Sequence, residues 1–186
     1  VSTTNVVVTG ATTGNAITAT PDSATVSAST MTINSGALTV TVSGTPVSQP
    51  VVRGVSGYTF ANFIFDASAS GENIRVTQLQ VRNTFATTLA ADQSTMALYD
   101  GVTALTTGSN VKSPTLADGT TPNDYTFTLD TPLVITKNTQ KIITLKGNIL
   151  GNATAGSVRW GLSATDTGTT YVTATGVSTG NAISVT

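Results

Sequence analysis

The chain contains no cysteine and no histidine, and only 9% of its 186 residues are charged. Without histidine, it has no side chain whose ordinary pKa suits general base catalysis near neutral pH. Without cysteine, it has neither a thiol nucleophile nor a thiolate ligand for zinc. An S-x-x-K sequence runs from Ser109 to Lys112, but that chemistry needs a helical turn, which this loop-like region does not favour. We therefore expect that the protein is not an enzyme.

Charge of either sign is scarce and evenly spread. Eight basic and nine acidic residues give a net charge of −1, and like charges do not form runs. Nucleic-acid binding rests on a basic patch, so we expect no nucleic-acid partner. The longest apolar runs are far shorter than the roughly 20 residues of a membrane helix, so we expect no membrane insertion.

Threonine and serine are present in excess, at 40 and 17 positions. A branched Cβ restricts χ1 and packs well on a pleated surface, so threonine and valine together favour strands. Hydroxyl and amide groups stay hydrated without charge. Such a surface suggests an extracellular, cell-surface location.

Apolar residues recur at every second position in the segments 38–42, 125–129 and 158–162. This period of two is typical of strands with one buried face. Turn signals such as Ser-Gly and Asp-Gly separate these segments. The pattern predicts an all-β fold, an antiparallel Ig-like or jelly-roll-type β-sandwich with an N-terminal β-hairpin extension.

Two long strands change parity midway, over residues 58–65 and 74–81. A β-bulge absorbs such a slip because two residues then face a single partner. We expect bulges near Ala61-Asn62 and Thr77-Gln78, in two strands at the centre of the fold.

One segment of the chain occurs twice. Residues 3–20 read TTNVVVTGATTGNAITAT, residues 169–186 read TTYVTATGVSTGNAISVT, and 11 of 18 positions are identical at an offset of 166. Each copy is predicted to be a hairpin. The apolar residues expected to take part in assembly are Val6, Val8, Ile17, Val172 and Ile183.

Three explanations of this repeat stay open. The chain is one unit of a tandem array with a period of about 166 residues, or residues 1–20 are an arm that docks on a neighbouring subunit's sheet edge. The third is coincidence between Thr-rich hairpins. In either of the first two, residues 1–29 form a hairpin arm and linker, residues 30–186 form the sandwich, and the partners are copies of the chain or neighbouring repeats.

Residues 37–83 carry a further pattern, followed by ALYDG at 97–101 and VTATG at 172–176. It resembles β-sandwich modules in large surface proteins of uncultivated bacteria and some archaea, including S-layer-like and filament proteins. The resemblance implies cell-surface display and repetition, with no catalytic residues. The matching positions are Gln49, Val51, Val52, Gly54, Phe63, Phe65, Ala67, Glu72, Ile74, Val76, Leu79 and Val81.

Calcium is the ligand that the oxygen-rich turns could best hold. Asp118, Asn123 and Asp124 lie within seven residues, and Asp66 and Glu72 flank another turn. The competing explanation is two ordinary Asx-type turns. No other cofactor is expected.

The sequence suggests two connections with carbohydrate, a glycosylation site and a sugar-binding surface. Asn152 begins an N-glycosylation sequon in a predicted turn. Trp160 and Tyr171 could form a sugar-binding platform, although Trp160 is in phase with core positions and Tyr171 is expected to be exposed. The sequence thus favours a structural building block of a surface assembly, with an adhesin or carbohydrate-binding module as the alternative.

Overall fold

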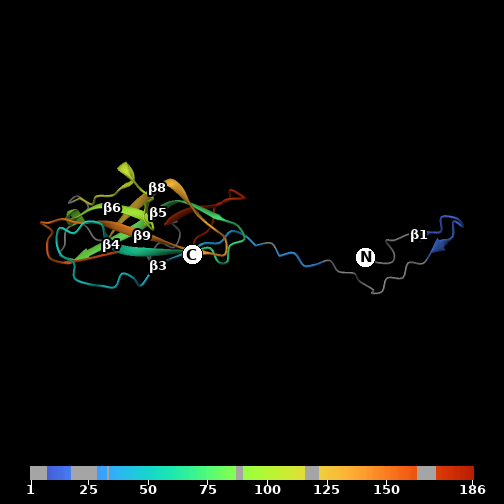
Figure 1. Ribbon diagram of the computed structural model, residues 1–186, viewed down its shortest axis with the longest axis horizontal. Helices are drawn as coiled ribbons and strands as arrows, with labels where there is room; N and C mark the ends of the chain where they lie inside the picture. Colours follow the sequence, from blue (N-terminus) through green and yellow to red (C-terminus); the bar gives the residue numbers. More distant parts are fainter. Residues whose placement is uncertain (1–7, 18–28, 33, 87–89, 116–121, 163–170) are drawn as a thin grey trace. The chain divides into compact units, whose positions relative to one another are not determined.

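Strands make up nearly all of the regular structure in this computed structural model, which describes residues 8–17, 29–32, 34–86, 90–115, 122–162 and 171–186. The chain divides into two compact units, Val1–Ile33 and Asn34–Thr186. The first unit holds an antiparallel hairpin of β1 (Val8–Thr9) and β2 (Ala16–Ile17). The second holds two larger sheets (Figure 1).

One of these sheets has five antiparallel strands in the order β3-β4-β9-β6-β7. Its longer strands show the predicted alternation of buried and less buried side chains. The bounds are β3 Thr39–Val42, β4 Tyr58–Asp66, β6 Gln93–Asp100, β7 Thr103–Ala104 and β9 Gln140–Ile149.

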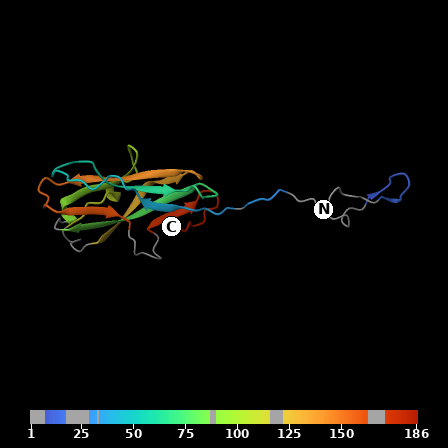
Figure 2. The same ribbon diagram turned by 90° about the horizontal axis from the view of Figure 1, so that it is seen from below.

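The other sheet is built around the long strand β5 (Ile74–Ala86). β8 (Asn123–Ile135) pairs along one edge of β5, and β11 (Val172–Gly176) and β10 (Ser157–Gly161) follow one another along the other edge. All of these pairs are antiparallel. The strands of both sheets run along a common direction (Figures 1 and 2).

Both predicted bulges are present. The register of β4 against β9 shifts between Thr59 and Ala61, which makes Phe60 the extra residue, one position before the predicted pair. The register of β5 against β8 shifts between Val76 and Gln78, at the predicted Thr77. Each bulge turns the later apolar residues of its strand back toward the core.

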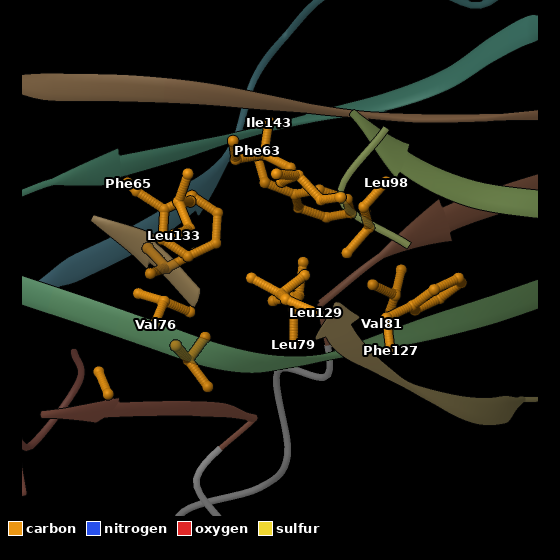
Figure 3. Packing of buried hydrophobic residues seen from close by; sticks show 14 of the residues in the cluster. Phe63, Phe65, Val76, Leu79, Val81, Leu98, Phe127, Leu129, Leu133 and Ile143 are labelled. Atoms are coloured by element: carbon orange, nitrogen blue, oxygen red, sulfur yellow. The ribbon is translucent and has the colours of Figure 1, made fainter. Parts of the chain in front are cut away.

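The core lies between the two sheets, where side chains from both inner faces meet (Figure 3). Phe63 and Phe65 of β4 face the β5 side chains Val76 and Leu79 across this layer. The one mismatch with the predicted alternation is Val42, which is 43% exposed although Leu38 and Val40 are buried. Val42 is the last residue of an edge strand, so the chain leaves the sheet where its side chain would otherwise be covered.

The C-terminal segment closes one side of the sandwich. The Ile183 N–H donates to the Ala174 carbonyl of β11 at 2.9 Å. Two residues further on, Val185 forms a parallel bridge with Leu38, and the Thr186 carbonyl accepts from the Val40 N–H at 3.0 Å. The C-terminus therefore lies beside β3 and connects the two sheets (Figure 1).

Leu105 closes the other side. Its N–H donates to the Leu98 carbonyl of β6 at 2.8 Å, and its carbonyl accepts from the Asp130 N–H of β8 at 2.9 Å. Backbone hydrogen bonds thus link the sheets at both margins.

These features confirm an all-β fold of antiparallel sheets packed as a β-sandwich, and the finer Ig-like or jelly-roll topology stays a prediction. Helical structure in the described residues is limited to two 3-10 turns, η2 (Ala90–Asp92) and η3 (Gly108–Asn110). In this described part, no helix has the length and apolar character to span a membrane.

Candidate assembly site

The N-terminal repeat folds into a short hairpin in which Val8 faces Ile17 and Thr9 faces Ala16. The Gly10 N–H donates to the Asn15 carbonyl at 2.9 Å, and the Gly14 N–H donates to the Gly10 carbonyl at 2.8 Å. Gly14 has a φ of +66°, a conformation that side chains disfavour.

The C-terminal repeat forms the same turn 166 residues later. The Gly176 N–H donates to the Asn181 carbonyl and the Gly180 N–H to the Gly176 carbonyl, both at 2.9 Å. Gly180 has a φ of +71°, and Thr175 bridges Ala182 as Thr9 pairs with Ala16. The repeat in the sequence is therefore also a repeat of backbone structure.

The two copies differ in how far their own unit covers them. Val8 is 38% and Ile17 53% exposed, whereas the equivalent Ala174 and Ile183 are 4% and 7% exposed. The same isoleucine is thus uncovered in one hairpin and part of the sandwich core in the other.

Glu72 holds the C-terminal hairpin in place. Its carboxylate accepts hydrogen bonds from the Ser178 N–H at 2.8 Å, the Thr179 N–H at 3.1 Å and the Thr179 hydroxyl at 2.7 Å. The Thr179 hydroxyl is the main reason why the pKa of Glu72 lies below its usual range, since these donors favour the charged form. The adjacent Asn73 carbonyl accepts from the Val177 N–H at 2.8 Å.

Close backbone approach completes this contact. A Cβ at Gly176 would overlap the Glu72 carboxylate, and a Cβ at Gly36 would overlap the end of Ile183. Ile74 lies beside the same point at Gly36. We call Gly36, Glu72, Asn73 and Ile74 the Glu72 cradle.

The assembly residues predicted from the repeat occupy different environments. Val172 is buried in β11 opposite Leu79, and Ile183 packs at the cradle. Val8 and Ile17 form the exposed face of the N-terminal hairpin, and Val6 lies outside the described residues. Sequence reasoning did not assign the cradle role of Glu72, although it is the only glutamate in the chain.

One of the predicted calcium ligands is engaged by a protein side chain instead. Asp124 forms a two-pronged ion pair with Arg82, with contacts of 2.8 and 2.7 Å. The Arg82 hydrogen bond lowers the pKa of Asp124. Asn123 begins β8 opposite Asn83, and Asp118 lies outside the described residues. Among the described residues no group of three or more acidic side chains is placed to hold a metal, and the calcium site stays a prediction.

The second acidic turn is likewise engaged by protein groups. Asp66 accepts from the Ser68 N–H at 2.8 Å and from the Gln140 amide at 2.7 Å. Hydrogen bonds from Ser68, and then from Gln140, lower the pKa of Asp66. Glu72 points to the C-terminal hairpin instead of forming a shared site with Asp66.

The residues that the sequence connects with carbohydrate differ in their exposure. Asn152 lies exposed in a turn, which makes the sequon accessible. Trp160 is 3% exposed, and its indole N–H donates to Gln93 at 2.6 Å, so its predicted core position is confirmed. Tyr171, expected to be exposed, is partly buried: it packs against the core, and burial raises its pKa.

Together these observations define the class of the protein as an antiparallel β-sandwich with a duplicated hairpin, one copy of which is docked on a glutamate. No protein-family model, curated protein or solved structure matches the chain. The resemblance to bacterial and archaeal surface modules therefore stays a prediction.

Proposed function

We propose that this protein is a structural building block of an extracellular surface assembly, such as a filament, an S-layer or a tandem-domain surface protein. Its units are joined by docking of hairpins. The observation that carries the proposal is the hairpin that occurs twice, once covered by the sandwich and once with its apolar face exposed. A two-stranded hairpin is marginally stable alone in water, so an uncovered copy calls for a partner surface.

The chemistry of the acidic residues supports a structural role. Hydrogen bonds lower the pKa of Asp66, Glu72, Asp124 and Asp130. For Asp130 the main donors are the Thr107 hydroxyl and the Asn110 amide, which tie η3 to β8. A catalytic acid working near neutral pH needs a raised pKa, and these four shifts go the other way.

The extracellular assignment rests on the surface. Threonine and serine hydroxyls replace charge over most of the chain, and Asn152 offers an accessible sequon. Backbone hydrogen bonds across both margins of the sandwich suit a unit that must resist unfolding.

An adhesin or carbohydrate-binding module is the second candidate, and a groove in the sandwich favours it. Residues 43–53 and β10 flank this groove, and Tyr58, Phe60 and Arg159 are among its lining residues. The Tyr58 and Phe60 rings meet edge to face at 5.1 Å. Aromatic rings beside polar groups are typical of sugar sites.

Negative-stain electron microscopy of the purified full chain tests the proposal. We expect filaments or sheets that are lost in a chain lacking residues 1–29 and in a full chain carrying Val8→Asp and Ile17→Asp. Val102→Asp is the matched control, because Val102 is 95% exposed on the sandwich. Isolated monomers with and without calcium would contradict the proposal and favour the carbohydrate-binding alternative.

A further inference from the structure

The contact at the Glu72 cradle depends on a small set of groups in the C-terminal hairpin. They are two backbone N–H groups, one threonine hydroxyl, one glycine without a side chain and one isoleucine. The N-terminal hairpin carries the same groups, with Gly10, Thr13 and Ile17 at the positions of Gly176, Thr179 and Ile183.

The geometry of these groups is also repeated. The Thr13 hydroxyl accepts from the Asn15 N–H at 3.4 Å, and the Thr179 hydroxyl accepts from the Asn181 N–H at 3.3 Å. With the matching Gly14 and Gly180 turns, the donors that face Glu72 in one hairpin are preformed in the other.

We propose that the Glu72 cradle is the acceptor for the N-terminal hairpin of a second copy of this chain, which takes the place of the cradle's own C-terminal hairpin. This inference rests on the proposed function and names the partner surface for it. Exchange of closely similar elements between copies costs little, because most contacts broken are replaced by equivalent ones, with Val8 in place of the buried Ala174.

A second copy is the occupant that the proposed assembly calls for. Docking would cover Ile17 as Ile183 is covered, against Gly36 and Ile74. The docked hairpin would then stand where the C-terminal hairpin closes the sandwich, so one copy would complete the sandwich of the next.

The two glycines allow a test in the full chain. A valine at position 176 would collide with the Glu72 carboxylate, which could move only by giving up its three hydrogen bonds. Neither Gly10 nor Gly176 has a positive φ, so the backbone itself accepts valine at both sites. A Cβ at Gly10 would lie 2.8 Å from the Thr13 hydroxyl, so valine there also turns that hydroxyl away from its place within the hairpin. Four chains are compared: wild type, Gly10→Val, Gly176→Val and the double variant.

Melting temperature and molar mass by light scattering are measured for each chain. We expect Gly10→Val to leave the melting temperature unchanged in the wild-type background. Gly176→Val should form dimers or larger species, and adding Gly10→Val should both lower its melting temperature and abolish those species.

Equal effects of Gly10→Val in both backgrounds would overturn the proposal. A monomeric Gly176→Val chain that still depends on Gly10 would also overturn it, because docking would then occur within one chain.

A second measurement keeps Gly176 in place and displaces only the end of the Ile183 side chain, which a Cβ at Gly36 would overlap. The chain has no cysteine, so an Ile17→Cys chain mixed with a Gly36→Cys chain can crosslink as a mixed dimer only between these two positions. We expect this dimer under mild oxidation and its loss when Val102→Cys replaces Ile17→Cys. Absence of the dimer, while the wild-type chain still forms filaments, would reject the cradle as acceptor and leave the proposed function standing.

Discussion

At the scale of the residue, Glu72 is the group on which the docked hairpin depends most directly. It accepts three hydrogen bonds from residues more than 100 positions away in the chain. Because these donors favour the carboxylate, the pKa of Glu72 is lower in the folded chain than its ordinary value of 4.5. The stabilisation that follows is fully present above that ordinary value and is lost as pH falls through the lower folded pKa.

Acidification should therefore loosen the C-terminal hairpin. From about pH 6 to about pH 3, hydrogen-exchange protection factors of the Ser178 and Thr179 amides should fall. In a Glu72→Gln chain the same amides should be less protected at neutral pH and nearly insensitive to acid.

Asp66→Asn is the matched control, because the pKa of Asp66 is also lowered but by Ser68 and Gln140. It should leave the pH response of the two hairpin amides intact. An unchanged acid response in Glu72→Gln would show that another group holds the hairpin.

At the scale of the element, two hairpins with the same backbone structure contribute differently to the free energy of unfolding. Burial decides this difference, since apolar surface removed from water contributes roughly 25 cal/mol per Å². Ile183 is 7% exposed and belongs to the core, whereas Ile17 is 53% exposed.

The substitution of alanine for each isoleucine should reveal the difference. Ile183→Ala should lower the free energy of unfolding by about 2–4 kcal/mol, through lost burial and the cavity left behind. Ile17→Ala should change it by less than about 0.5 kcal/mol. Urea unfolding followed by the fluorescence of the single tryptophan, the buried Trp160, measures both. Equal losses would mean that the N-terminal hairpin is covered as well.

At the scale of the whole molecule, the described core lies entirely within the second unit. Its buried members extend from Leu38 to Ile183, and none belongs to Val1–Ile33. The sandwich should thus hold its stability without the first unit, while assembly should require that unit.

Deletion of residues 1–29 should leave the melting temperature of the monomer within about 2 °C of the full chain, because about 1 kcal/mol corresponds to 2–4 °C for a chain of this size. Calorimetry on dilute, unassembled protein measures this. Val102→Asp provides the reference for a neutral surface change. A fall of more than about 4 °C would indicate that the hairpin docks on the sandwich of its own chain.

Sequence alone determined what depends on near neighbours along the chain. The period of two placed Phe127 and Trp160 in the core, and the change of parity located the bulge at Thr77. The Gly-Asn-Ala-Ile repeat predicted hairpins whose turns proved to share the same hydrogen bonds. Side-chain alternation and turn chemistry are local, so a linear pattern records them.

Only the tertiary structure decided the contacts between residues that lie far apart in the sequence. In the folded chain Tyr171, expected to be exposed, is partly buried against the core, and Val42, expected to be buried, is 43% exposed. The tertiary structure paired Asp124 with Arg82 and gave Glu72 the donors of a hairpin that lies 106 residues further along. The hairpin sequences do not say which copy is docked, since they are nearly the same. The C-terminal copy is covered because its first strand is β11 itself, which pairs with β5 and places the hairpin beside the cradle residues when the two sheets close.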